Sequence, residues 1–262
     1  MAGFLRRAAG ECRNLDVTLG RSGTLLASCL LFEAARTHKS VDTKPLKNFA
    51  DSAMTAIWKK AGSFDRTRRP SPAFDYLGIA HGWAGLLYAT LRWCSCSGVS
   101  LPRQVEPSLW GLAACAERHG EGMRWPVLPA DASGGYMSGW CHGSAGYVHL
   151  WTEAYRALGK TEFLALAESA ARDTWEVRPQ AGHICCGLAG QAYGLLALFQ
   201  QTKDQVWLQR ARKLARLAAG AAVTPEYASS LYKGDVGIAI LAAEIATPDD
   251  ACMPFFGREG WQ

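Results

Sequence analysis

The 262-residue sequence has little charge, few strand signals and no long apolar run. Charged residues make up 19% and hydrophobic residues 49%, whereas about 25% of an average soluble protein is charged. This composition excludes a disordered chain. The longest stretch of apolar and small residues, Ser22–Phe32, is far below the roughly 20 residues that span a bilayer. β-Branched runs of alternating polarity do not recur, which disfavours an all-β fold.

The sequence also lacks a long basic run and an export signal. Its formal net charge is +5, and its basic residues are scattered apart from the short Arg66–Arg69 cluster. We therefore expect no nucleic acid among its partners. Met1–Ala9 contains no apolar core of a signal peptide, so we expect a cytoplasmic protein without a membrane span. We treat residues 1–262 as a single domain, long enough to bury a full core.

Nine cysteines are many for such a chain. Their number is odd and no export signal accompanies them, so reduced thiols are expected rather than disulfides. Some of these thiols are candidates for metal ligands.

A Gly-x-x-Gly step followed by an apolar helical run occurs five times. The five steps are Gly20–Gly23, Gly82–Gly85, Gly143–Gly146, Gly187–Gly190 and Gly234–Gly237. Each opens a short segment that is rich in Ala and Leu and apolar nearly all round, which predicts a buried helix. Glycine at these steps lets the chain turn sharply and lets neighbouring helices approach closely.

More polar helical stretches are expected between these steps, at about 44–61, 105–119, 161–175 and 203–221. The last has one apolar stripe on an otherwise basic helix, begins at Lys203 or Asp204 and ends near Gly220. Each repeat therefore pairs an outer helix with a buried inner helix. Stacked pairs form either a solenoid or a closed α/α toroid, and both place the loops before the inner helices on one rim.

These loops carry side chains that can bind a metal. His81, Cys141 and the pair Cys185 and Cys186 stand one or two positions before the repeat glycine of the second, third and fourth copies. Zinc needs three or four converging donors, and a helix N-terminus stabilises thiolates. Cysteines are also among the most buried residues, so the pair is equally compatible with two small core side chains.

Other histidines and cysteines receive structural interpretations. His142 and His183 are expected to flank the site, and Cys94 and Cys96 are expected to pack in the core. Three histidines outside the loops are expected on helix surfaces or edges: His38, His119 and His149.

Five motifs resemble, in order, those of the lanthionine synthetase C-like family. They include Gly78-Ile-Ala-His81-Gly-Trp-Ala-Gly, Trp140-Cys141-His-Gly, Cys185-Cys186-Gly and Ser230-Leu-Tyr-Lys-Gly, and the resemblance runs from about Asn14 to the C-terminus. The resemblance implies an all-α fold, an α/α toroid with a double layer of inner and outer helices. Family members have seven helix pairs, so this chain is expected to contain five and to lack N-terminal ones.

The resemblance also implies a zinc site and an acid–base pair. Cys141, Cys185 and Cys186 match the zinc ligands, and Cys186 stands where the family usually has histidine, as in the subset with three cysteine ligands. His81 and Asp16 match the active-site residues. Met137 occupies the position of an arginine found in many members, so that helper is expected to be missing.

The implied activity is that of a zinc-dependent lanthionine cyclase. Three protein ligands leave one zinc position open for a substrate thiol, which adds to dehydroalanine or dehydrobutyrine of a dehydrated precursor peptide. Three thiolates leave the zinc centre with a charge of −1, which keeps the substrate sulfur nucleophilic. His81 would protonate the enolate carbon or accept the thiol proton, and Asp16 would orient His81 or transfer a proton itself. A dehydratase or kinase-like domain is a possible partner.

Two other functions remain open at this point. The first is addition of glutathione to dehydroamino acids, as in eukaryotic family members. The second is a helical-repeat accessory module whose metal site is structural or degenerate.

Two missing helix pairs predict an open arc. The flanks Leu25–Phe32 and Ile238–Ala246 would lose their neighbours and expose an apolar patch that is unusual in a soluble monomer. The chain is then expected to dimerise, to pair with a separate N-terminal piece or to be the tail of a longer synthetase. The alternative is a tightened five-pair ring.

Overall fold

The computed structural model describes residues 1–38, 40–65, 74–129, 135–221 and 225–257, so the Arg66–Arg69 cluster lies outside the described residues. Its helices are α1 (Ala2–Ala8), α2 (Arg21–Arg36), α3 (Lys44–Ala61), α4 (Trp83–Ser97), α5 (Val105–Ala113), α6 (Ser144–Leu158), α7 (Thr161–Glu176), α8 (Leu188–Thr202), α9 (Gln205–Ala219) and α10 (Asp235–Glu244). The remaining elements are β1 (Glu117–His119), β2 (Gly122–Arg124) and the short 3₁₀ helix η2 (Pro225–Tyr227).

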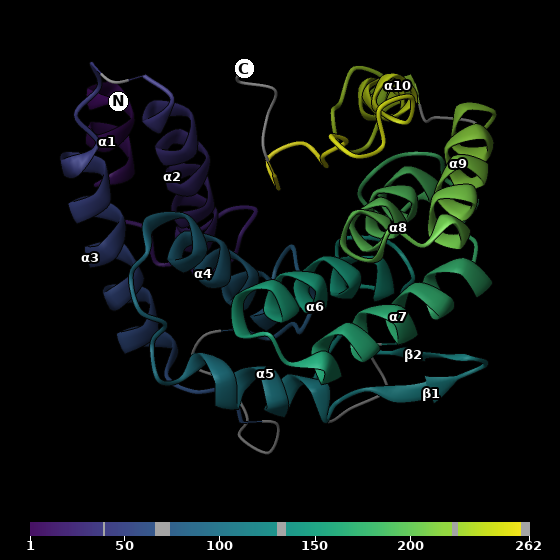
Figure 1. Ribbon diagram of the computed structural model, residues 1–262, viewed down its shortest axis with the longest axis horizontal. Coiled ribbons are helices and arrows are strands. Elements are labelled where there is room, and N and C mark those ends of the chain that lie inside the picture. Colours follow the sequence, from purple (N-terminus) through teal and green to yellow (C-terminus); the bar gives the residue numbers. More distant parts are fainter. Residues whose placement is uncertain (39, 66–73, 130–134, 222–224, 258–262) are drawn as a thin grey trace.

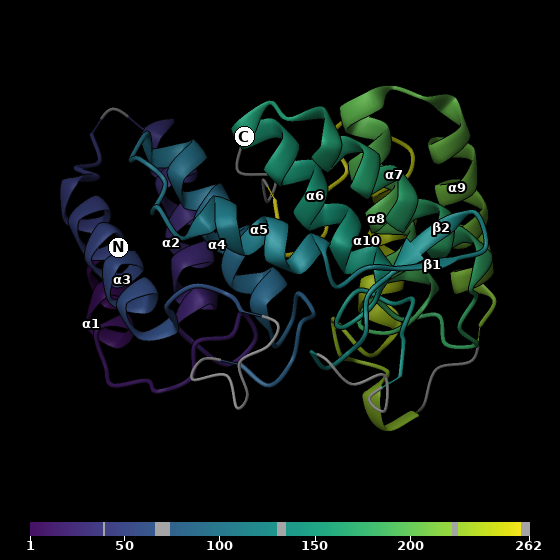
Figure 2. The same cartoon turned by 90° about the horizontal axis from the view of Figure 1, so that it is seen from below.

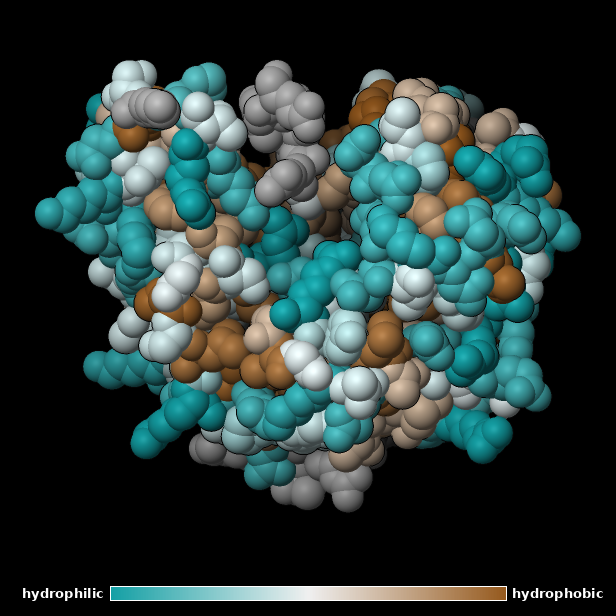
Figure 3. All heavy atoms as spheres, in the orientation of Figure 1, coloured by the Kyte–Doolittle hydropathy of each residue, from teal (hydrophilic) through white to brown (hydrophobic). Residues whose placement is uncertain are grey.

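The helices form two layers bent into an arc. Inner helices α2, α4, α6, α8 and α10 pack on one another in that order, and α3, α5, α7 and α9 cover them from outside. Figures 1 and 2 place α1–α3 at one end of the arc and α9–α10 at the other. Figure 3 shows the surface hollowed between these ends. The all-α class and the double layer of helices are therefore confirmed.

Every Gly-x-x-Gly step begins an inner helix, as predicted. The first glycine of each step is the residue before the helix, with extended backbone at φ between −113° and −141°. Glycine is thus needed for close approach rather than for a left-handed turn. An added Cβ on Gly85 or Gly146 would overlap the carbonyl oxygen of the residue six positions earlier, Ile79 or Trp140.

Backbone hydrogen bonds join the five loops before the inner helices. The N–H of the residue two positions before each first glycine donates to the carbonyl of its equivalent in the next loop. The series runs from Thr18 to Ala80 (3.2 Å), Ala80 to Cys141 (3.0 Å), Cys141 to Cys185 (3.0 Å) and Cys185 to Tyr232 (2.9 Å). We call this series the rim ladder. It places the loops on one rim, as the repeats predict.

The outer helices agree with the predicted ranges except for one. α3, α7 and α9 match within two residues, and the side chain of Asp204 accepts the Val206 N–H at the start of α9. The helix expected at 105–119 ends at Ala113, and β1 pairs instead with β2 as an antiparallel hairpin. Gly120 allows the tight turn with φ of +51°, a conformation that favours glycine. Packing of β2 on α7 stabilises the hairpin.

Only one of the two predicted apolar flanks is open. The prediction for α2 is wrong, because Leu25, Cys29 and Phe32 are buried against neighbouring helices, with Phe32 packed on Trp93 of α4. On α10, Ile238 and Leu241 are buried, whereas four alanines of the predicted flank are exposed: Ala239, Ala242, Ala243 and Ala246. Within the described ranges, no helix is both long and apolar enough to cross a membrane.

Candidate metal centre and acid–base pair

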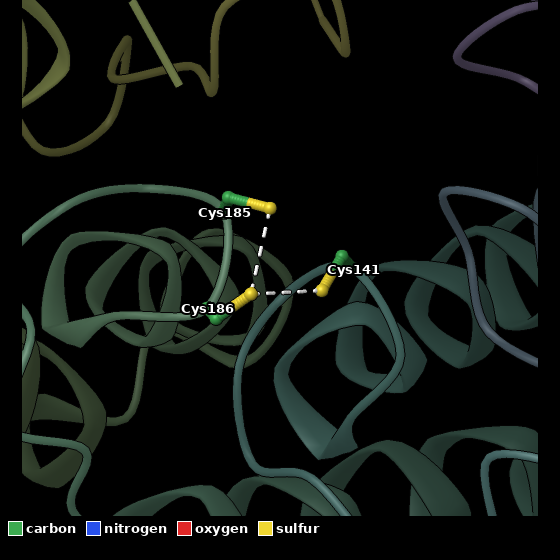
Figure 4. Close-up of side chains that lie close together, drawn as sticks. All are labelled: Cys141, Cys185 and Cys186. Atoms are coloured by element: carbon green, nitrogen blue, oxygen red, sulfur yellow. Dashed lines mark hydrogen bonds between the residues drawn. The ribbon is translucent and has the colours of Figure 1, made fainter. Parts of the chain in front are cut away.

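Cys141, Cys185 and Cys186 bring their sulfur atoms together at the rim. Cys141 precedes α6 and the cysteine pair precedes α8, and Figure 4 shows the three sulfurs gathered between these loops. The Sγ of Cys186 lies 3.2 Å from that of Cys141 and 3.5 Å from that of Cys185. All three sulfurs lie within 4.8 Å of one another. We call this group the rim cluster.

The geometry and charge of the rim cluster fit a zinc ion. Zn–S bonds of about 2.3 Å in a tetrahedron separate sulfurs by about 3.8 Å, slightly more than the two distances of 3.2 and 3.5 Å in the rim cluster. Hydrogen bonds from Cys141 and Cys185 lower the pKa of Cys186. Contacts with the other two sulfurs, followed by burial, raise the pKa of Cys141. Without a cation, the cluster therefore favours a single thiolate. Three thiolates can lie this close together only around a positive charge that offsets their repulsion.

Close approach of the loops depends on two glycines that lie four residues before the repeat glycine. An added Cβ on Gly139 would lie 2.6 Å from Cys186 Cα, and one on Gly78 would lie 2.5 Å from His142 Cα. The Gly-x-x-Gly pattern does not include these two glycines. Because both glycines recur at the same position, in the second and third copies, the sequence did contain a pattern that could have indicated this close contact.

His81 and Asp16 form a hydrogen-bonded pair on the same rim. His81 Nδ1 lies 2.9 Å from Asp16 Oδ2, and the Asp16 side chain is almost fully buried. Burial alone would raise the pKa of Asp16, but hydrogen bonds from His81 and the Leu19 N–H hold it below its usual value. The fixed carboxylate orients Nδ1 of His81. Nε2 is left as the nitrogen that can exchange a proton with a substrate.

His142 and His183 flank these two groups. The His142 ring lies 5.5 Å from the His81 ring and 4.9 Å from the Tyr76 ring, between centroids. Burial lowers the pKa of His142, which favours a neutral ring. His183 Nδ1 accepts the Cys186 N–H at 3.4 Å. The rim ladder bond from Ala80 to Cys141 joins the loop of His81 to that of the rim cluster.

The histidines outside the loops follow the prediction in part. His38 is exposed, and His119 lies on the hairpin with its Nδ1 2.7 Å from Asp173 Oδ1. His149 was expected at a surface or edge, and this expectation is wrong. It is buried in α6 because an inner helix is covered on nearly all sides, and burial lowers its pKa to about 3.

A second group of sulfur and carboxylate atoms lies between α2 and α4. One ligand atom each from Cys29, Glu33 and Cys96 lies within 4.8 Å of the others. Arg92 Nη2 also lies 3.3 Å from both carboxylate oxygens of Glu33. A divalent cation would have to compete with this guanidinium, so we interpret the group as a partly buried ion pair between helices. Cys94 packs against Met54, in line with the structural role expected for it.

The fold and its rim define the class of the protein: an α/α-toroid protein with three converging thiols at the start of its inner helices. The family model of the lanthionine synthetase C-like protein matches residues 4–255, and the chain belongs to this family.

The chain is also similar to two characterised proteins. It is 29% identical over 189 residues to glutathione S-transferase LANCL1 of Danio rerio, a match that covers 70% of this chain and 46% of that protein. The chain thus spans about half the length of this relative. Nisin cyclase has the same fold, with a TM-score of 0.71 at 14% identity over 94% of this chain and 68% of nisin cyclase. This neighbour supports the toroid architecture.

Proposed function

We propose that the chain is a zinc-dependent lanthionine cyclase. It would add a cysteine thiolate of a dehydrated precursor peptide to dehydroalanine or dehydrobutyrine and form a thioether ring. The convergence of Cys141, Cys185 and Cys186 on the rim that also carries the His81–Asp16 pair carries this proposal. Family membership and the fold shared with nisin cyclase support it.

Cys141, Cys185 and Cys186 would hold the zinc ion. When bound, zinc would lower the pKa of an entering thiol and keep the resulting thiolate at the site. Three protein ligands leave room for that substrate sulfur. Cys185 and Cys186 are half-buried rather than fully buried, which supports access of a peptide thiol to this site.

His81 would handle the proton that the addition requires. The thiol loses its proton, a carbon–sulfur bond forms at the β-carbon, and the double-bond electrons move toward the α-carbon. That carbon then takes up one proton, so the reaction has no leaving group and needs no oxidant. Nε2 of His81 can deliver this proton because Asp16 holds Nδ1 and stabilises the charged ring.

The substrate implies a preceding dehydration. Dehydroalanine and dehydrobutyrine arise by loss of water from serine and threonine, so a dehydratase or kinase-like partner domain acting in the cytoplasm would supply the peptide. This chain's contribution would be the ring closure.

A thiol-alkylation assay tests the proposal. A dehydrated peptide with one cysteine is incubated with the full chain and zinc and then alkylated, and its mass is measured by mass spectrometry. Cyclisation removes the free thiol, so the peptide is expected to escape alkylation. Cys141→Ser should abolish this protection, whereas Cys115→Ser should retain it because Cys115 lies outside the rim cluster. Full alkylation with the intact chain would contradict the proposal.

Glutathione addition is the second candidate, favoured by the 29% identity to a relative named as a glutathione S-transferase. The same cysteines would then activate the thiol of glutathione rather than that of the peptide. A dehydrated peptide without cysteine, incubated with glutathione, separates the two activities because only glutathione addition increases its mass. An accessory module would give neither product.

A further inference from the structure

The C-terminal segment Ala251–Gly257, which we call the tail, runs back into the interior of the arc. Figure 1 shows it as the yellow loop that leaves the α10 end of the arc and crosses toward the middle. Ala251, Met253 and Phe256 are buried, and Phe256 is only 2% exposed. The tail is therefore part of the packed interior.

Side chains of the inner layer hold the tail at two carbonyl groups. The Tyr232 hydroxyl donates to the Pro254 carbonyl at 2.6 Å. The Tyr88 hydroxyl donates to the Phe256 carbonyl at 2.7 Å, and the Arg92 guanidinium donates to the same oxygen. Phe255 lies between these anchors with φ of +64°. This conformation is rare for a bulky residue and persists only where contacts on both sides impose it.

The tail also contacts the loops that carry the rim cluster. The Phe256 ring packs edge-on against Trp140, with centroids 5.2 Å apart, and Trp140 directly precedes Cys141. The Tyr232 ring also packs on Trp140, with centroids 5.1 Å apart, and the Tyr232 carbonyl accepts the Cys185 N–H. Both ligand loops therefore contact residues that anchor the tail or belong to it.

We propose that docking of the tail and metal binding by the rim cluster are coupled, with Phe256 and Tyr232 as positioning residues. This inference rests on the zinc centre of the proposed function. Sulfur ligands must hold their positions closely, and loss of the support under Trp140 would let the Cys141 loop move. Coupling free energies are reciprocal, so a bound metal must also strengthen docking of the tail.

Zinc affinity of two variants tests one direction of the coupling. Phe256→Leu removes the ring beside Trp140, and Tyr232→Phe removes only the hydroxyl that holds Pro254. Zinc affinity is measured by competition with a chromophoric chelator. Both variants should bind zinc about tenfold more weakly, the lower end of the effect of groups that support metal ligands.

Two matched variants control for general loss of packing. Phe163→Leu changes an equally buried ring stacked on Trp151, between α6 and α7. Tyr147→Phe removes a buried hydroxyl that has no hydrogen-bond partner among the described residues. Neither residue touches the tail or the rim cluster, so both controls should keep the zinc affinity of the intact chain.

Hydrogen exchange of the tail tests the other direction. Peptides covering Ala251–Gly257 should exchange more slowly with zinc than with a chelator, and Cys141→Ala should remove that difference. The coupling is refuted if zinc leaves tail exchange unchanged or if the variants match their controls. If either result is found while the intact chain still binds zinc, the coupling fails but the proposed function stands. An intact chain that binds no zinc would overturn both.

Discussion

Two groups of cysteines lie between neighbouring inner helices, and they differ in the charge that accompanies them. The rim cluster contains three sulfurs that hydrogen-bond to one another. The group between α2 and α4 contains two sulfurs and Glu33, but Arg92 already pairs with the carboxylate. Proximity of potential ligands alone therefore does not define a metal site. A carboxylate that an internal cation already neutralises is not available as a ligand.

The backbone around the two groups differs as well. The rim ladder and the close-packed glycines position Cys141 and Cys185 from equivalent places in consecutive repeats. Cys29 and Cys96 instead lie on helical turns, where each thiol donates to a backbone carbonyl of α4. Loop geometry thus builds the rim cluster, whereas helix packing builds the other group.

Replacement of His81 should give the largest change in rate near the rim cluster. His81→Ala is expected to keep bound zinc and to slow cyclisation by about 10²–10⁴, the usual contribution of a positioned acid–base group. His119→Ala, at a second His–Asp pair that involves the β1–β2 hairpin, is the control and should keep the rate. Single-turnover alkylation assays measure both. An unchanged rate for His81→Ala would remove this residue from the mechanism.

Replacement of Arg92 should mark the second group as structural. Arg92→Leu leaves Glu33 without its partner and removes an anchor of Phe256, so it is expected to lower the free energy of unfolding by about 2–4 kcal/mol. Denaturant unfolding measures this effect. If Arg92 instead occupies a place that a metal needs, Arg92→Leu would raise the zinc content above one per chain, contrary to our interpretation.

Exchange of one rim ligand should have a moderate effect. Cys186→His supplies the ligand usual in the family, so zinc should remain bound. The charge of the centre rises from −1 to 0, which makes the bound substrate sulfur less nucleophilic, and we expect cyclisation to slow by about tenfold. Metal content and rate are measured on the same preparation. Loss of zinc would show that the loop cannot accept an imidazole.

The hydrogen-bonded pair of Asp16 and His81 should give a small, pH-dependent effect on stability. The pKa of Asp16 is lower in the folded protein, so its stabilising contribution is present above its unfolded value of about 3.9 and is lost as the pH falls through the folded value. Asp16→Asn should therefore cost about 1 kcal/mol at pH 6. The difference from the intact chain should shrink below about pH 4, as followed by denaturant unfolding across pH.

The repeat carries most of what the sequence could predict. Gly-x-x-Gly spacing predicts the inner helices because it reflects a close contact made in the same way five times. Cys141 and Cys185 occupy equivalent positions of consecutive copies, so the repeat also predicts that they converge. The pairing of Asp16 with His81 came from the family resemblance, and the structure brings the two side chains together.

Contacts without periodicity could not be predicted. The hairpin of β1 and β2 has three residues in each strand and depends on packing against α7. The hydrogen bond from Tyr88 to Phe256 joins residues 168 positions apart. Burial of α2 likewise depends on side chains of other helices. Each of these features results from tertiary packing rather than from a local pattern.

Metal analysis of the purified full chain tests the central claim most directly. The intact chain and Cys29→Ala should each contain about one zinc ion per molecule, and Cys141→Ala should contain almost none. This result would assign the metal to the rim cluster. Zinc retained in Cys141→Ala, or lost in Cys29→Ala, would contradict the account.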